Sequence, residues 1–132
     1  MRTLVLSTFI VVLVSVASAT VSAQAVRRVT FSKGATSTVL SGTLNSYKGS
    51  ARYKIRVRRG QTLTTASIGD SHPVTITIKE PSGSFSDEDM DLSCHSRHTV
   101  NPTTAGDYTI IVTECQKADP WRGKFKVRVN VN

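Results

Sequence analysis

Alternation of apolar and polar residues, with a period of two, is the feature that most constrains how this chain can fold. It is clearest in residues 51–58, where Tyr53, Ile55 and Val57 alternate with arginine and lysine. Successive side chains of a β-strand point to opposite faces, so this segment places an apolar row on one face and a cationic row on the other. No segment has a convincing helical period of 3.6 residues, and the pattern therefore predicts an all-β protein.

The same alternation recurs along the chain, between clusters of turn-forming residues. Short strands separated in this way are typical of a single antiparallel β-sandwich, here of about eight strands. Residues 107–115 are apolar on both faces, which predicts a central strand covered on each side, and Gly106-Asp107-Tyr108 resembles a tyrosine corner. The expected strands are residues 26–31, 36–44, 51–58, 61–67, 74–79, 107–115 and 124–131.

Two segments without alternation are the candidate binding loops, because binding residues tend to lie on loops held by a rigid scaffold. Residues 82–99 form the longest irregular stretch and carry the densest cluster of acidic residues, four of the nine. Residues 116–123 contain Trp121, the only tryptophan, which is either an exposed anchor for a partner or a ring folded back over the end of the sandwich. The candidate partner-binding residues are Asp87, Glu88, Asp89, Asp91, His95, Arg97, His98, Lys117, Asp119, Trp121 and Arg122.

Residues 1–23 have the pattern of a cleaved secretory signal peptide. Arg2 precedes an apolar run that ends in two small-x-small sites, Ala17-Ser18-Ala19 and Val21-Ser22-Ala23. The run is shorter than the roughly twenty residues of a membrane-spanning helix, although an uncleaved anchor is the alternative. We expect residues 24–132 to form one domain in the periplasm or outside the cell, with no transmembrane segment after cleavage.

Cys94 and Cys115 are the only cysteines. In an exported chain, two cysteines most simply form one disulfide, and closing a loop of this length should contribute on the order of 3 kcal/mol to stability. Free thiols or a metal site are the alternatives.

Positive charge is concentrated in the first half of the mature chain, where no acidic residue precedes Asp70. Such asymmetry suggests an anionic neighbour, such as a cell-envelope polymer, although a solvated strand face is an equally simple explanation. Nucleic acid is not an expected partner, since no stacking aromatics accompany the basic residues. The candidate basic face consists of Arg52, Lys54, Arg56 and Arg58.

The sequence contains no arrangement typical of a catalytic centre. There is no Gly-x-Ser-x-Gly elbow, and four of the nine acidic residues crowd one segment, with no pair recognisable as flanking a cleft. Cys94, His95 and His98 suggest a zinc site, but the two histidines would face opposite ways on a strand and the disulfide would use the cysteine. Residues 87–91 could bind calcium, yet they lack the spacing of an EF-hand loop. We therefore expect no enzyme, no metal and no cofactor.

Several segments resemble a known family in their order and spacing. They are residues 29–37 (VTFSKGATS), Ser41-Gly42, Tyr53, residues 59–63 (RGQTL), residues 102–110 (PTTAGDYTI) and residues 123–127 (GKFKV). Together they resemble the periplasmic inhibitors of g-type (goose-type) lysozyme, and also the bacterial pre-peptidase C-terminal (PPC) domain, a jelly-roll-like β-sandwich module. The candidate loops do not match the family, so no inhibitory residue is carried over.

The resemblance implies a sandwich that inhibits g-type lysozyme by plugging the enzyme's cleft with loops, and by position residues 82–99 and 116–123 would do so. An acidic loop at 87–91 would complement an electropositive lysozyme cleft, whereas the basic half would face away from the enzyme. The alternative is a stand-alone PPC-like module that binds an anionic envelope polymer or a partner protein through its basic face.

Overall fold

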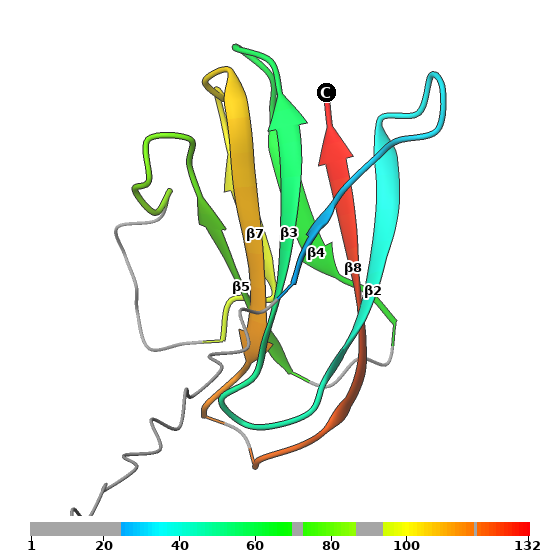
Figure 1. Cartoon of the computed structure of the whole chain (residues 1–132), viewed down its shortest axis with the longest axis vertical. Helices are drawn as coiled ribbons and strands as arrows, with labels where there is room; N and C mark the ends of the chain where they lie inside the picture. Colours follow the sequence, from blue (N-terminus) through cyan, green and yellow to red (C-terminus); the bar gives the residue numbers. More distant parts are fainter. Residues whose placement is uncertain (1–24, 70–72, 87–93, 118) are drawn as a thin grey trace, which may run out of the picture.

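The computed structural model describes residues 25–69, 73–86, 94–117 and 119–132 (Figure 1). Within these residues every regular element is a strand, as the alternation predicts, and no helix long and apolar enough to cross a membrane occurs in this part of the chain. The strands are β1 (Val26–Arg28), β2 (Ser37–Leu44), β3 (Ser50–Val57), β4 (Leu63–Ser67), β5 (Val74–Lys79), β6 (Arg97–Val100), β7 (Gly106–Glu114) and β8 (Gly123–Val131).

The strands form two four-stranded sheets that pack face to face as a sandwich. Sheet A has the order β1-β3-β7-β5, and sheet B has the order β2-β8-β4-β6. Every pairing is antiparallel except that of β1 with β3, which is parallel. The predicted antiparallel β-sandwich of eight strands is confirmed, with one parallel pair at the edge of sheet A. Because β1 and β2 lie in different sheets, no hairpin fixes the direction of β1.

The core lies between the sheets and consists of the inward residues of each alternating strand. In β3 these are Tyr53, Ile55 and Val57, and in β8 the buried positions alternate in the same way, so the predicted faces of both strands are confirmed. Gly42 in β2 lies under the ring of Phe125, and a Cβ there would come within 2.7 Å of the Tyr53 hydroxyl. This close approach explains why the strand has glycine at an inward position.

The predicted tyrosine corner is present at the start of β7. Tyr108 is fully buried, and its hydroxyl accepts a hydrogen bond of 3.0 Å from the backbone N–H of Thr104, four residues earlier. The ring therefore fills the core while its polar atom satisfies a backbone donor in the preceding turn.

One polar side chain bridges the two sheets at each lateral side of the sandwich. On one side, the Tyr53 hydroxyl of β3 donates a hydrogen bond of 3.2 Å to the carbonyl of Ser41 in β2, and burial raises the pKa of this phenol. On the other side, His98 of β6 contacts the Ile76 carbonyl of β5 at 3.3 Å. The Ile76 N–H also donates to the His95 carbonyl at 2.7 Å, so the edges of the two sheets are joined through the backbone as well.

Three sequence-based expectations about strands are corrected. The segment 82–99 is not irregular throughout, because β6 begins at Arg97 and pairs with β4. The first strand ends at Arg28 and not at Phe31. The Val29 N–H still donates a hydrogen bond to the Lys54 carbonyl of β3, and the chain then leaves this strand. The strand β7 is central, as expected, but its outward residues such as Ile111 are only half-buried, since only sheet B covers it.

Candidate partner-binding surfaces

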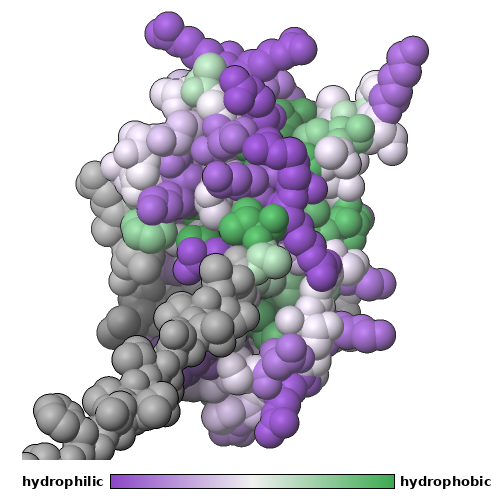
Figure 2. All heavy atoms as spheres, in the orientation of Figure 1, coloured by the Kyte–Doolittle hydropathy of each residue, from purple (hydrophilic) through white to green (hydrophobic). Residues whose placement is uncertain are grey.

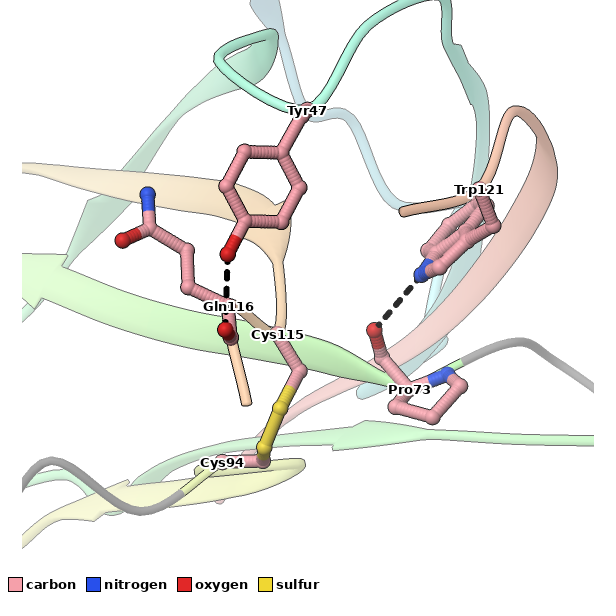
Figure 3. The surroundings of a disulfide bond; sticks show 6 residues. All are labelled: Tyr47, Pro73, Cys94, Cys115, Gln116 and Trp121. Atoms are coloured by element: carbon pink, nitrogen blue, oxygen red, sulfur yellow. Dashed lines mark hydrogen bonds between the residues drawn. A yellow bond between two sulfur atoms is a disulfide. The ribbon is translucent and has the colours of Figure 1, made fainter. Parts of the chain in front are cut away.

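The predicted disulfide between Cys94 and Cys115 is present at one end of the sandwich (Figure 3). The two Cα atoms are 5.2 Å apart, within the ordinary range for a disulfide. Cys115 directly follows β7 of sheet A, and Cys94 lies three residues before β6 of sheet B. The bond therefore joins the two sheets and marks the start of the 116–122 loop.

Trp121 is folded back over this end of the sandwich, which is the second of the two arrangements considered for it. Its indole Nε1–H donates a hydrogen bond of 3.2 Å to the Pro73 carbonyl, and its ring packs half-buried against the core (Figure 3). Its backbone N–H donates to Glu114 Oε1 at 2.8 Å. The other three candidates in this loop, Lys117, Asp119 and Arg122, are exposed.

A tyrosine from another loop fixes the opposite side of the same turn. The hydroxyl of Tyr47, in the β2–β3 connection, donates a hydrogen bond of 2.6 Å to the Gln116 carbonyl (Figure 3). With Cys115, Gln116 and Trp121 all held, the 116–122 loop is anchored at both of its ends.

Glu114 is a site residue that the sequence-based reasoning missed. Its side chain is only 1% exposed, and while Oε1 accepts the Trp121 hydrogen bond, Oε2 has no hydrogen-bond partner within the described residues. The signal for its burial was the strand period, because Glu114 follows Val112 by two residues and shares the inward face of β7.

The candidate residues around β6 lie in different environments. Arg97 is exposed and His95 is half-buried, but His98 is only 8% exposed, with Nε2 2.7 Å from Ser86 Oγ. His98 is therefore not the exposed loop histidine that the sequence suggested: it lies on a strand, and strand alternation directs its ring into the sandwich. Of the remaining candidates, Asp87, Glu88, Asp89 and Asp91 lie outside the described residues.

The proposed metal ligands do not come together in the described residues. Cys94 is in the disulfide, His98 points inward, and no group of three His, Cys, Asp or Glu residues that could hold a metal ion occurs in the described ranges. The calcium candidates at 87–91 fall outside those ranges.

The basic row of β3 lies on the outer face of sheet A. Arg52, Lys54 and Arg56 are exposed, and Arg58 is exposed just beyond the end of the strand. Figure 2 shows hydrophilic residues crowding the upper and central part of the view, with small apolar areas between them.

An ion pair that was not predicted from the sequence crosses this face. The guanidinium of Arg28 in β1 donates two hydrogen bonds to the Asp107 carboxylate in β7, at 3.2 and 3.0 Å, and Arg56 approaches the same carboxylate at 4.0 Å. The hydrogen bonds from Arg28, together with the charges of Arg28, Arg56 and Lys54, lower the pKa of Asp107. Asp107 thus offsets part of the positive charge of the sheet A outer face.

The comparisons with known proteins identify the fold. In sequence, no protein-family model and no curated protein matches the chain. In structure, the chain is similar to PliG of Aeromonas hydrophila, a periplasmic lysozyme inhibitor of g-type lysozyme, with a TM-score of 0.62 and 19% identity over 81% of this chain and 96% of that chain. The fold is that of the PliG inhibitors.

Two further solved structures share this fold. PliG of Salmonella Typhimurium matches with a TM-score of 0.57 and 18% identity, over 81% of this chain and 97% of that chain. The pre-peptidase C-terminal domain of a Bacillus anthracis collagenase matches with a TM-score of 0.56 and 12% identity, over 83% of this chain and 97% of that chain. The fold indicated by both sequence resemblances is thereby confirmed for this chain.

Proposed function

We propose that the mature chain is an exported, non-catalytic protein that binds and inhibits g-type lysozyme. The support is a structural similarity that extends over nearly the whole of the PliG chains, and not over one shared hairpin.

The observation that carries the proposal is the construction of the disulfide end. Cys94 lies within the 82–99 segment and Cys115 directly precedes the 116–122 loop, so one bond ties the two candidate loops together. Trp121 and Tyr47 fix the second loop through side-chain hydrogen bonds. A loop held in this way loses little conformational entropy on binding, which is what a tight inhibitor requires.

We further propose that the exposed side chains of the 116–122 loop contact the enzyme, with the acidic residues at 87–91 as a second contact. Lys117, Asp119 and Arg122 face solvent on the anchored loop. Carboxylates at 87–91 would speed association with an electropositive cleft, while the basic outer faces of the sheets would be directed away from it.

Export is part of the proposal. Residues 1–23 are the proposed signal peptide and residues 24–132 the mature domain, in the periplasm, where the PliG proteins act. A disulfide between Cys94 and Cys115 is consistent with such an oxidising compartment.

The test is titration of the oxidised mature protein into a cell-lysis assay with g-type lysozyme, with c-type lysozyme as the control. We expect stoichiometric inhibition of the g-type enzyme alone. The combined substitution of Lys117, Asp119 and Arg122 by alanine should weaken inhibition, whereas R52Q/K54Q/R56Q should not. Absence of inhibition at micromolar protein would overturn the proposal.

The acidic residues have their own test within this assay. Replacing Asp87, Glu88, Asp89 and Asp91 by their amides should slow association with the lysozyme and reduce its salt dependence. An unchanged association rate would remove these residues from the proposed contact.

A further inference from the structure

The outer face of sheet B carries a straight row of cations that has no role in the proposed inhibition. Lys124, Lys126 and Arg128 are all exposed along β8, and the residues between them are directed into the core. Alternate residues of a strand are about 6.7 Å apart, so the Cα atoms of the three cationic residues repeat at that spacing. Arg97 of β6 adds a fourth exposed charge on the same face.

Small side chains flank this row on both neighbouring strands. Ser41 lies opposite Lys126 and Thr43 opposite Lys124 in β2, while Ala66 of β4 lies between Arg128 and Arg97. The exposed hydroxyls of β2 can donate hydrogen bonds, and the short side chains leave the cations accessible from the side. Such a surface can accommodate an anionic chain lying along the strand.

The four strands of sheet B contain no aspartate or glutamate at all. Sheet A differs, because Asp107 lies on its outer face and pairs with Arg28 and Arg56. The contacts of Arg28 and Arg56 with Asp107 are the only ion pairs among the described residues. No described carboxylate therefore pairs with the cations of β8. On sheet A the Asp107 carboxylate offsets part of the cationic charge, whereas no described carboxylate lies in the strands of sheet B.

We propose that the outer face of sheet B binds a linear polyanion that carries one phosphate or sulfate group per repeat and lies along β8. Charge complementarity and the regular spacing of Lys124, Lys126 and Arg128 favour a linear polymer. A membrane surface is disfavoured as the ligand. Among the described residues, Val39 is the one large apolar residue exposed on this face, with 45% of its surface accessible, and no aromatic anchor accompanies it. This inference goes beyond lysozyme inhibition and places the two activities on different parts of the molecule.

The test compares two triple variants that remove the same charge from opposite faces, K124Q/K126Q/R128Q and R52Q/K54Q/R56Q. The probes are long-chain polyphosphate and heparin, which separate phosphate from sulfate chemistry, and affinity is measured at several salt concentrations. We expect the sheet B variant to lose affinity by about a hundredfold at low salt, and the sheet A variant to lose much less. The salt dependence of the sheet B variant should fall by roughly one unit of slope per cation removed.

Three outcomes would overturn the proposal: equal losses in the two variants, which would mean that net charge alone binds; no loss in the sheet B variant; and binding to phosphatidylglycerol vesicles without binding to either polymer. Thermal unfolding of each variant verifies that it is folded. Lysozyme inhibition measured on the same samples separates this proposal from the proposed function, because we expect both variants to inhibit as the unmodified protein does.

Discussion

The two sheets share one core but differ in the charged residues on their outer faces and in the contacts at the ends of their strands. Sheet A has an ion pair across its outer face, a tyrosine corner at the start of its central strand and a disulfide just after the end of that strand. Sheet B has a row of exposed cations and no acidic residue in any strand. The described ion pairs lie on sheet A, so the cations of sheet B have no described carboxylate as a partner.

The central strands show the difference at equivalent places. In β7, Tyr108 fills the core and also bonds to the backbone, whereas in β8 the buried ring is Phe125, which has no polar atom. On the outer faces, Asp107 lies opposite Arg56, whereas Ser41 lies opposite Lys126. At each of these pairs of positions, a single substitution gives one sheet the kind of residue that the other sheet has.

Removal of the disulfide should have the largest effect on stability. The double substitution of Cys94 and Cys115 by alanine opens the loop that the disulfide closes between residues 21 positions apart. It should lower the free energy of unfolding by about 3 kcal/mol. Urea unfolding measures it. The unmodified protein under reducing conditions is the control and should match the variant. An unchanged midpoint would show that the contacts of sheet A do not depend on its covalent link to sheet B.

Tyr108→Phe gives the central strand of sheet A the same aromatic residue as that of sheet B. The Thr104 N–H would lose its acceptor next to the core, so we expect a loss of about 1–2 kcal/mol in urea unfolding. Tyr47→Phe is the matched control: it removes an exposed hydrogen bond that water can replace, and it should cost less. Equal losses in the two variants would contradict a special role for the tyrosine corner.

Ser41→Asp introduces onto sheet B the kind of carboxylate that Asp107 supplies on sheet A. It lies opposite Lys126, so the affinity for polyphosphate should fall by about fivefold at low salt. Ser41→Asn has nearly the same shape without the charge and should bind as the unmodified protein does. If both variants bind alike, the absence of acids from sheet B has no bearing on binding.

Asp107→Asn makes the converse change and should have the smallest effect, because the ion pair with Arg28 is exposed. The pKa of Asp107 is lowered in the folded protein, so its stabilising contribution is present above its unfolded pKa of about 3.9 and is lost as the pH falls through the lower folded value. The variant should therefore melt slightly below the unmodified protein at pH 5–7, and the two should converge in stronger acid. Asp119→Asn is the control; a difference that grows on acidification would contradict this account.

The fold could be predicted largely from local alternation. The strand β5 has the bounds expected from Val74, Ile76 and Ile78. The strand β3 differs from expectation by one residue at each end, and β8 by one residue at its start. The strand β6 was missed because it has four residues and its inward side chains include His98, so its hydropathy does not alternate clearly. Polar residues that satisfy their hydrogen bonds inside the sandwich are invisible to a pattern based on hydrophobicity.

The candidate surfaces were less predictable, because they depend on contacts between distant segments. Arg28 and Asp107 are 79 residues apart in sequence and belong to strands that are not neighbours in the sheet. The sequence predicted two possible positions for Trp121 but could not decide between them. The acceptor that holds the ring is the Pro73 carbonyl, 48 residues away in sequence. The disulfide was predictable because Cys94 had one possible partner.

The polar bridges at the two lateral sides of the sandwich have a consequence for cooperativity. Tyr53 joins the sheets along one side, and His98 joins them along the other. If the sheets were joined along one side only, they could open like a book about that hinge. Closure on both sides removes the hinge, so we expect the core amides of β7 and β8 to exchange their hydrogens together, in a single global opening event.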